Sequence, residues 1–236
     1  MVREQFEEIE RYVRKHRSMQ HPFLDRFGEM TVEQLRLFTK EQYLLSVTLP
    51  QALAAAYSIA EDVQHDGETT PLWTLAKPLI SFLDQEHWGN QEAGAHSLYL
   101  LDLSSSLEMS LRDLTHHRQF EETKTFTETR TRICREGPFL RAVAALALGN
   151  EYANAQIFPR YLEGVERIRK RTKVAISTGY FDAHVRDEIS DYEKFLAMVT
   201  PFLKHRGYEN ALYSGTTELL EARQKWYDVL IDRLFV

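Results

Sequence analysis

PFLRAVAALALGNEYANAQIF, residues 138–158, is rich in alanine and leucine, above all between Leu140 and Leu148. Gly137 and Pro138 open it as a helix, because proline suits the first helical position. Its apolar face is so wide that the whole helix should be buried against other helices. We therefore expect a central helix with several others packed around it.

The same helical spacing of apolar residues recurs through the rest of the chain. No stretch shows the sustained alternation that a half-buried strand needs. The sequence thus predicts an all-α fold, an irregular bundle of seven to nine helices in one domain that spans residues 1–236. The predicted helices cover residues 2–18, 31–50 from a Thr31–Gln34 capping box, 50–65, 72–88 with a bend at Pro78, 90–114, 138–158, 160–173, 182–199 and 216–235, with a polar helix or loop before Gly137.

Composition and charge exclude several classes of protein. The formal charge of -6 comes from interleaved acids and bases, which gives no surface for a nucleic-acid backbone. The N-terminus is charged and amphipathic, and no run approaches 18 apolar residues, so we expect a cytoplasmic protein without a membrane partner. The only cysteine, Cys134, cannot form an internal disulfide.

Glu151 lies within the most apolar helix, one turn after Leu148 and one turn before Ala155. A carboxylate removed from water must be protonated, paired or bound to a cation. Arg141 or Arg160 could pair with it as a purely structural alternative. The sequence therefore predicts that Glu151 has a partner in the interior.

Two further segments place histidine and carboxylate four residues apart. In GYFDAHVRDEISDYEKF (179–195), His184, Glu188 and Asp191 share one helix face, and in EHWGNQEAGAHSLYLL (86–101) Glu92 precedes His96. Imidazole and carboxylate on successive turns are how helical bundles hold iron and manganese. Each pair taken alone is equally typical of an exposed or structural helix face.

The order of these groups resembles the haem-oxygenase-like di-iron oxidases, which include the chlamydial death-domain-associating protein. That group is related to pyrroloquinoline-quinone synthase C and to thiaminase II (TenA). The resemblance extends over about residues 10–230 and implies a haem-oxygenase-like bundle. The residues that carry it are His21-Pro22-Phe23, Gln42-Tyr43, Pro50, His96, Glu151, His184 and Glu188.

The resemblance implies metal ligands, and the chain departs from the family pattern at one or two of them. His96, Glu151, His184 and Glu188 match. Where the family has a last histidine this chain has Asp191, an oxygen ligand that iron or manganese accepts, so the site either survives with altered charge or is degenerate. The first carboxylate is Glu92, which has the better helical phase, or else Glu86.

The resemblance also implies a tyrosine near the metal that contacts substrate or takes part in redox steps. Tyr180 lies one turn before His184, and Tyr43 is a second candidate of the same kind. Either tyrosine could instead be an ordinary core aromatic.

We expect one or two non-haem iron ions, with manganese as an alternative, in a homodimeric enzyme that uses dioxygen on a small organic or amino-acid-derived substrate. A non-catalytic binding bundle with a degenerate metal site is one alternative. Another is a TenA-like hydrolase, for which Cys134 would be the nucleophile if Arg132 and Arg135 lower its pKa. A haem oxygenase proper would need His16 or His21 as the iron ligand.

Overall fold

The computed structural model describes residues 2–61, 63–65, 68–88, 96–204 and 207–235, and in these ranges the chain is almost entirely helical. Short 3-10 turns, η1 (Arg17–Gln20), η2 (Phe27–Glu29) and η4 (Thr200–Lys204), join some of the helices. The longer elements are α1 (Val2–Lys15), α2 (Pro22–Arg26), α3 (Val32–Ser58), β1 (Val63–His65), β2 (Glu68–Thr70), α4 (Leu72–Trp88), α5 (His96–Ser106), α6 (Leu111–Thr115), α7 (Glu121–Glu136), α8 (Phe139–Ala144), the π-helical η3 (Ala145–Tyr152), α9 (Ala153–Thr172), α10 (Gly179–Val199) and α11 (Tyr208–Leu234).

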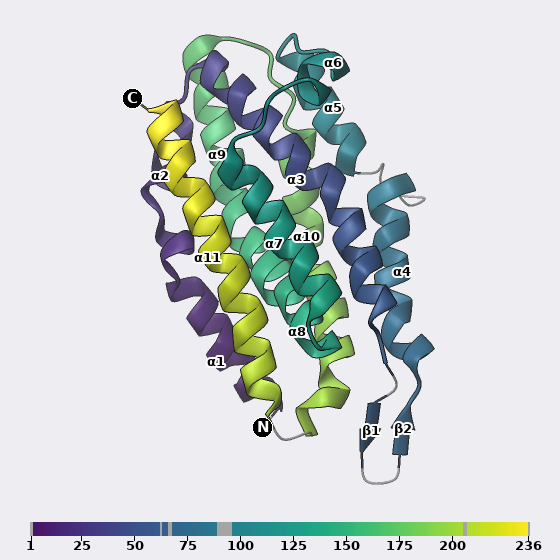
Figure 1. Ribbon diagram of the computed structural model, residues 1–236. Coiled ribbons are helices and arrows are strands. Elements are labelled where there is room, and N and C mark those ends of the chain that lie inside the picture. The colour runs from purple at the N-terminus through teal and green to yellow at the C-terminus, as the bar shows by residue number, and fades with distance from the viewer. Residues whose placement is uncertain (1, 62, 66–67, 89–95, 205–206, 236) are drawn as a thin grey trace.

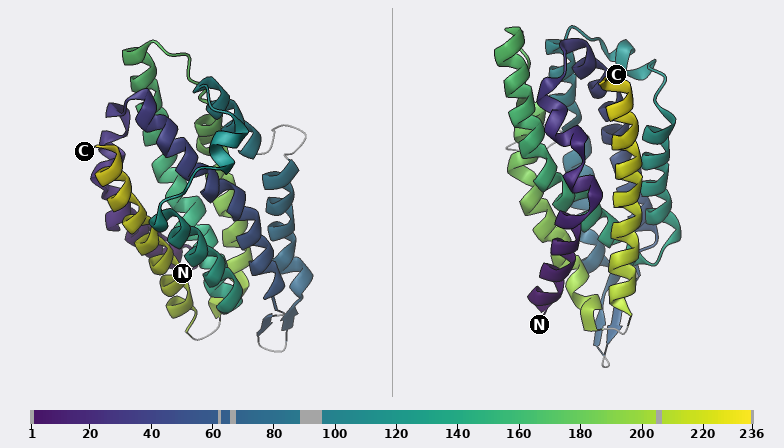
Figure 2. Two further views of the ribbon diagram at one scale, coloured as in Figure 1. Left: turned by 45° about the horizontal axis from the view of Figure 1, so that its top comes forward. Right: turned by 90° about the vertical axis from the view of Figure 1, so that its left-hand side faces the viewer.

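The helices form an elongated all-α bundle in which α8, η3 and α9 make one continuous rod (Figure 1). The chain's long helices α3, α7 and α11 run side by side in front of that rod, and α10 packs against α9, η3 and α5 (Figures 1 and 2). All eight residues of η3 are buried, as the wide apolar face predicts. Counted with the rod as one helix, the described ranges hold ten α-helices, slightly more than the seven to nine expected.

Two prolines that were expected to separate helices lie inside them. Helix α3 continues through Pro50 to Ser58, and α9 continues through Pro159 to Thr172. A proline inside a helix leaves the preceding turn short of a donor. In α3 the guanidinium of Arg130 on α7 supplies hydrogen bonds to that region, from Nη2 to the carbonyl of Leu45 at 2.6 Å and to Thr48 Oγ1 at 3.0 Å. Packing between helices therefore overrides the proline signal.

The helix expected over residues 90–114 is two helices from residue 96 onward, and residues 90–95 lie outside the described residues. Helix α5 ends at Ser106, and Glu108 adopts a left-handed backbone conformation with φ of 59°. A capping box then begins α6, in which Ser110 and Asp113 satisfy each other's backbone N–H groups. The cap was readable in the sequence, but the apolar spacing across it concealed the break.

A small antiparallel hairpin departs from the prediction that no strand is present. β1 pairs with β2, with Val63 opposite Thr70 and His65 opposite Glu68. Strands of three residues are too short to produce a recognisable alternation. The hairpin projects from one end of the bundle, below α4 in Figure 1.

The His21-Pro22-Phe23 motif caps helix α2. His21 Nδ1 accepts a hydrogen bond from the backbone N–H of Phe23 at 3.1 Å, and its Nε2 lies 3.0 Å from Asp228 Oδ1 on α11. Pro22 occupies the first turn, where it costs no hydrogen bond. This histidine is engaged through both ring nitrogens, which does not suit it to be a haem ligand.

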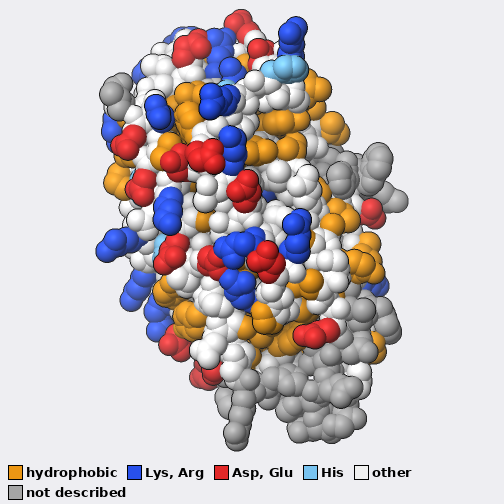
Figure 3. Space-filling model, in the orientation of Figure 1, with side chains coloured by type: hydrophobic (Ala, Val, Ile, Leu, Met, Phe, Trp, Pro, Cys, Tyr) orange, Lys and Arg blue, Asp and Glu red, His pale blue; other side chains and the backbone are white. Residues whose placement is uncertain are grey.

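Acidic and basic side chains interleave over the face shown in Figure 3, with hydrophobic side chains scattered between them. This agrees with the interleaved charges of the sequence. Within the described ranges, no helix combines the length and the apolarity needed to cross a membrane.

Candidate functional site

Glu151 enters the interior from the π-helical segment η3. A π-helical turn contains an extra residue, and such turns are frequent at functional sites. The side chain of Glu151 is 8% exposed, and Asn150 Nδ2 donates a hydrogen bond to its Oε1 at 3.1 Å. Neither arginine considered as its partner is available, because Arg141 is paired with Glu218 and Arg160 with Asp25.

Helix α10 contributes His184, Glu188 and Asp191, all three buried on the predicted face. His184 Nδ1 lies 2.5 Å from Glu188 Oε1. With the Nδ1–H donating to that carboxylate, the lone pair of the ring is on Nε2, which is the tautomer that metal-binding histidines adopt. Asp191 accepts a hydrogen bond from Lys194 Nζ at 2.7 Å, so its charge is already partly balanced from the rim of the bundle.

His96, the first residue of α5, faces α10. Its ring centroid is 4.4 Å from that of His184, so the two imidazoles predicted from separate segments are in contact. The structure adds Asp187, whose Oδ2 is 3.7 Å from His96 Nε2. Burial opposes the ionisation of Asp187, but hydrogen bonds with His96 and Arg186 outweigh it and lower its pKa. Sequence reasoning missed Asp187, although its position three residues after His184 is also compatible with that face.

Two carboxylates of this cluster, Glu151 and Asp191, have raised pKa values. Burial raises the pKa of Glu151 well above its usual value, and the neighbouring charge of Glu188, a hydrogen bond with Glu188 and the charge of Asp191 raise it further. Burial also raises the pKa of Asp191, against the opposing effect of Lys194. A bound cation would relieve the resistance of Glu151 and Asp191 to ionisation beside the charge of Glu188.

The donor set therefore fits iron or manganese in kind, with two imidazoles and three carboxylates. Within the described residues, however, no three His, Cys, Asp or Glu side chains already surround a common point. Glu92 lies outside the described residues, and so does the side chain of Glu86 on α4. The assignment of the six ligands stays a prediction.

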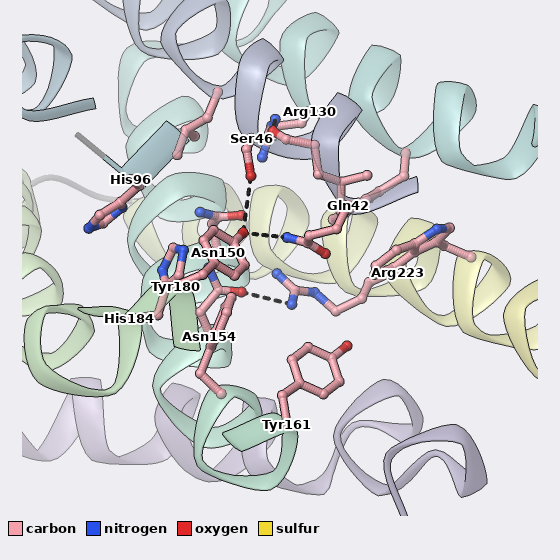
Figure 4. A pocket seen from close by; sticks show the side chains of 15 residues that line it. Gln42, Ser46, His96, Arg130, Asn150, Asn154, Tyr161, Tyr180, His184 and Arg223 are labelled. Atoms are coloured by element: carbon pink, nitrogen blue, oxygen red, sulfur yellow. Dashed lines mark hydrogen bonds between the residues drawn. The ribbon is translucent and has the colours of Figure 1, made fainter. Parts of the chain in front are cut away.

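Tyr180 lies at the centre of the site, 1% exposed. Its hydroxyl accepts a hydrogen bond from Gln42 Nε2 at 2.9 Å and is 3.0 Å from Ser46 Oγ, both on α3 (Figure 4). Its ring meets that of His184 edge-on at 4.7 Å. Tyr43 is half-buried beside Gln42 but is not among the described residues that line the cavity next to Tyr180.

That cavity extends from the two histidines, past Tyr180, to Arg223 (Figure 4). The space open to the centres of water molecules is about 40 Å³. At about 10–15 Å³ for each such molecule, it has room for roughly three waters. Its walls are formed by Gln42, Leu45, Ser46, Leu49, His96, Phe126, Arg130, Asn150, Asn154, Phe158, Tyr161, Tyr180, His184, Arg223 and Trp226.

Cys134 does not line this cavity. It is fully buried on α7, and burial raises the pKa of its thiol to about 12. The arginines that oppose this shift are Arg130 and Arg141, and they do not overcome it. The expectation of a thiol activated by Arg132 and Arg135 is therefore wrong, because the thiol is turned into an apolar environment that disfavours its charged form.

Solved structures with the same fold cover almost the whole chain. A CADD-like protein of unknown function from Nostoc punctiforme is 13% identical, with a TM-score of 0.79, and covers 100% of this chain and 99% of its own. A protein of heme oxygenase-like fold from Shewanella denitrificans is 14% identical, with a TM-score of 0.71 and coverage of 99% and 93%. A TenA homolog from Pseudomonas syringae pv. tomato is 13% identical, with a TM-score of 0.69 and coverage of 98% and 91%.

At these identities the similarity establishes the heme-oxygenase-like fold. No curated protein matches the chain. The model of the TENA/THI-4/PQQC family, in contrast, matches residues 8–205, which include every described member of the histidine and carboxylate cluster. The chain belongs to the TENA/THI-4/PQQC family.

Proposed function

We propose that the protein is an oxygen-activating, non-haem iron oxidase or oxygenase that acts on a small organic or amino-acid-derived substrate. The observation that carries the proposal is the buried cluster of Glu151, Glu188 and Asp191 beside two imidazoles, and these imidazoles line one end of a cavity. A buried carboxylate whose pKa is raised by its carboxylate neighbours, as that of Glu151 is, needs a proton or a cation, and a divalent metal would meet that need for the cluster.

His96, Glu151, His184 and Glu188 would hold the metal, with Asp191 and Glu92 as further ligands. Iron or manganese held by such groups supplies one-electron chemistry with dioxygen. Glu188 orients His184 by accepting its Nδ1–H, which directs Nε2 away from the carboxylate.

The surrounding residues protect the cluster and position the cavity. Phe158 stacks on His184 with ring centroids 3.9 Å apart, which keeps water from one face of the imidazole. Gln42 and Ser46 hold the hydroxyl of Tyr180 between the cluster and the rest of the cavity. The Tyr180 hydroxyl would therefore exchange a proton or an electron from one fixed position, beside the substrate.

A metal-independent hydrolase is the second candidate. The family includes TenA, and the TenA homolog from Pseudomonas syringae supports this assignment through its fold. Because the thiol of Cys134 is buried away from the cavity, such a hydrolase would have to use one of the cavity's oxygen or nitrogen groups. Hydrolysis would then survive chelation of metal, whereas oxidation would not.

The test is metal content. Iron, manganese and zinc are quantified per chain in freshly purified wild type and in His184→Ala. Because His184 would be a ligand, we expect iron or manganese in the wild type and roughly a tenfold or greater loss of it in the variant. Circular dichroism reports whether the helical fold is retained.

His116→Ala is the matched control, since His116 is exposed at the end of α6 and is not one of the proposed ligands. It should keep the metal content of the wild type. A wild type without bound metal, or a His184→Ala protein with unchanged metal and lower stability, would overturn the proposal and favour a structural network. Oxygen uptake, followed with an electrode, distinguishes the oxidase from the hydrolase.

A further inference from the structure

Arg223 carries a buried positive charge into the cavity at the end opposite the histidines. Its side chain is 4% exposed, although arginine is almost never buried without an acidic partner. Its Nη1 donates to Asn154 Oδ1 at 2.9 Å and its Nη2 to the carbonyl of Gly149 at 3.1 Å, both neutral acceptors. No carboxylate of the described residues forms a salt bridge with it. Its charge is therefore not balanced by the groups that surround it.

Two hydrogen-bond donors at this end lack an acceptor. Arg223 Nε and Trp226 Nε1 are both buried, and neither has a partner among the described residues. Both residues come from the same stretch of α11 and line the same cavity. Buried donors without acceptors are costly, so their presence points to a ligand that supplies oxygen atoms.

Two other residues that line the cavity add a second positive charge and an apolar wall. Arg130, 3% exposed, lines the cavity with a second guanidinium, and its Nη2 binds the carbonyl of Leu45. The ring of Phe126 lies 5.5 Å from Arg223 Cζ, and it makes an apolar wall beside the charge. A negatively charged group would be held by Arg223 while an apolar body lies against the aromatic ring.

We propose that this end of the cavity binds the carboxylate of a small organic acid, and that Arg223 with Trp226 is its anion subsite. A guanidinium edge matches a planar carboxylate in geometry. In Figure 4 Tyr180 lies between Arg223 and the two histidines, so an acid anchored at Arg223 directs its other end toward the histidine cluster. The inference rests on the proposed function in taking this cavity as the substrate pocket.

The experiment measures binding of acetate, butyrate and benzoate, with their amides and inorganic phosphate as comparisons. Titration calorimetry gives the affinity, and the intrinsic fluorescence, to which Trp226 contributes together with two other tryptophans, is a second readout of occupancy. We expect at least one carboxylate to bind and its amide to bind roughly ten- to a hundredfold more weakly, because charge-assisted hydrogen bonds are lost. Arg223→Met should weaken the acid by a similar factor and leave the amide unchanged.

Matched controls lie on the same helices. Arg233→Met on α11 and Arg132→Met on α7 remove exposed guanidinium groups and should bind the acid as the wild type does. If Arg223→Met does not fold, Arg223→Lys and Trp226→Phe provide the test, since they keep a charge or a ring and remove only part of the donor set. Each should bind the acid more weakly.

Binding is measured in metal-loaded and in chelator-treated protein, so that the two proposals can fail separately. Carboxylate binding that depends on Arg223 in metal-free protein supports the subsite even if no metal is ever found. Several results would overturn it: no acid bound by the wild type, equal affinity for acid and amide, tighter binding of phosphate, or acid binding that chelation abolishes and Arg223→Met leaves unchanged.

Discussion

The burial of Glu151 could be predicted from its position in the sequence alone. Its burial follows from the alanine and leucine that surround it, and the structure confirms that the side chain is buried. Its neighbours could not be derived in the same way, because Glu188 and Asp191 come from a helix more than thirty positions later. Helix phase predicted the face of α10, but only the packing of α10 against η3 makes the three carboxylates one electrostatic unit.

Asp187 and Arg223 were not predicted from the sequence as residues of the site. Asp187 stands one position before Glu188, and its contact with His96 depends on where α5 begins. Arg223 lies in a strongly charged stretch of α11, where an arginine is expected to face solvent. Neither the contact of Asp187 nor the burial of Arg223 is encoded in local spacing, since each results from the packing of two helices.

Cys134 allows a direct test of the buried thiol. The pKa of the thiol is raised from 9.0 to about 12 by burial. At pH 9 the folded protein should therefore react with iodoacetamide on the order of several hundredfold more slowly than the unfolded chain, whose thiol is partly ionised. Mass spectrometry of timed samples measures both rates. The stabilising effect of the raised pKa is present below pH 9 and is lost as the pH rises through 12.

Cys134→Ala complements this measurement. The variant should keep any enzymatic activity and lose about 1 kcal/mol of stability through the smaller side chain. Fast alkylation in the folded state, or loss of activity with the fold intact, would show that the thiol is accessible and would return Cys134 to consideration as a nucleophile.

Among the elements, the rod formed by α8, η3 and α9 has a feature that no apolar pattern reveals. The spacing of residues 138–158 predicts one helix, and the structure confirms helix there, but with π-helical geometry from Ala145 to Tyr152. The extra residue in such a turn shifts the direction of every side chain that follows it. Glu151 lies within this segment and Asn154 just after it, and the two side chains contact Asn150 and Arg223 respectively.

Helix ends were harder to predict than helices. Pro50 and Pro159 were expected to end helices because proline removes a backbone donor. In both places packing against neighbouring helices keeps the helix continuous. The capping box predicted at Thr31 did mark a true helix start, since a cap is a local arrangement that depends only on residues three apart. The box of Ser110 and Asp113, which begins α6, was not predicted.

Gly215 permits the closest approach between α11 and α8. A Cβ atom there would be 2.2 Å from the backbone carbonyl oxygen of Arg141. Because that carbonyl belongs to a buried helix and cannot turn aside, Gly215→Ala should destabilise the protein by about 2–3 kcal/mol. In a chain of this length that corresponds to a melting temperature roughly 5–10 °C lower, measured by circular dichroism.

Ser214→Ala is the control on the neighbouring, exposed position of α11. Its side chain bonds only to the carbonyl of Ala211 within the same helix, and alanine favours helix, so its melting temperature should stay within about 2 °C of the wild type. If both variants melt alike, the contact between α11 and α8 is looser than the geometry indicates.

At the level of the whole molecule, helical periodicity and the absence of long strands were enough to predict an all-α bundle. The family resemblance implied its heme-oxygenase-like type, and the fold comparison confirms it. The cavity could not be predicted, because it is defined by residues from α3, α5, α7, α9, α10 and α11 together with η3. A fold of this kind hosts more than one chemistry, so the site and not the architecture has to supply the function.

The buried cluster should make the stability of the whole bundle depend on metal. In the metal-free protein burial and the charges of Glu188 and Asp191 disfavour the ionised form of Glu151. A ligand that binds only the folded state stabilises it in proportion to the logarithm of its concentration. At about a hundredfold excess over its dissociation constant, iron or manganese should add about 3 kcal/mol, which raises the melting temperature by roughly 6–12 °C. Calorimetric scans of chelated and reloaded protein measure the difference.

The variant Glu188→Gln shows whether the rise in melting temperature comes from metal bound at the cluster or from a general effect of salt. Removing one charge of the cluster should raise the melting temperature of the metal-free protein, because Glu151 no longer faces a second carboxylate. The same change should reduce the response to metal, since a ligand oxygen has lost its charge. Magnesium at equal concentration serves as the ionic control and should have little effect. If chelated and loaded wild type melt together, or if Glu188→Gln responds to metal as fully as the wild type, the cluster is held by protons and hydrogen bonds alone.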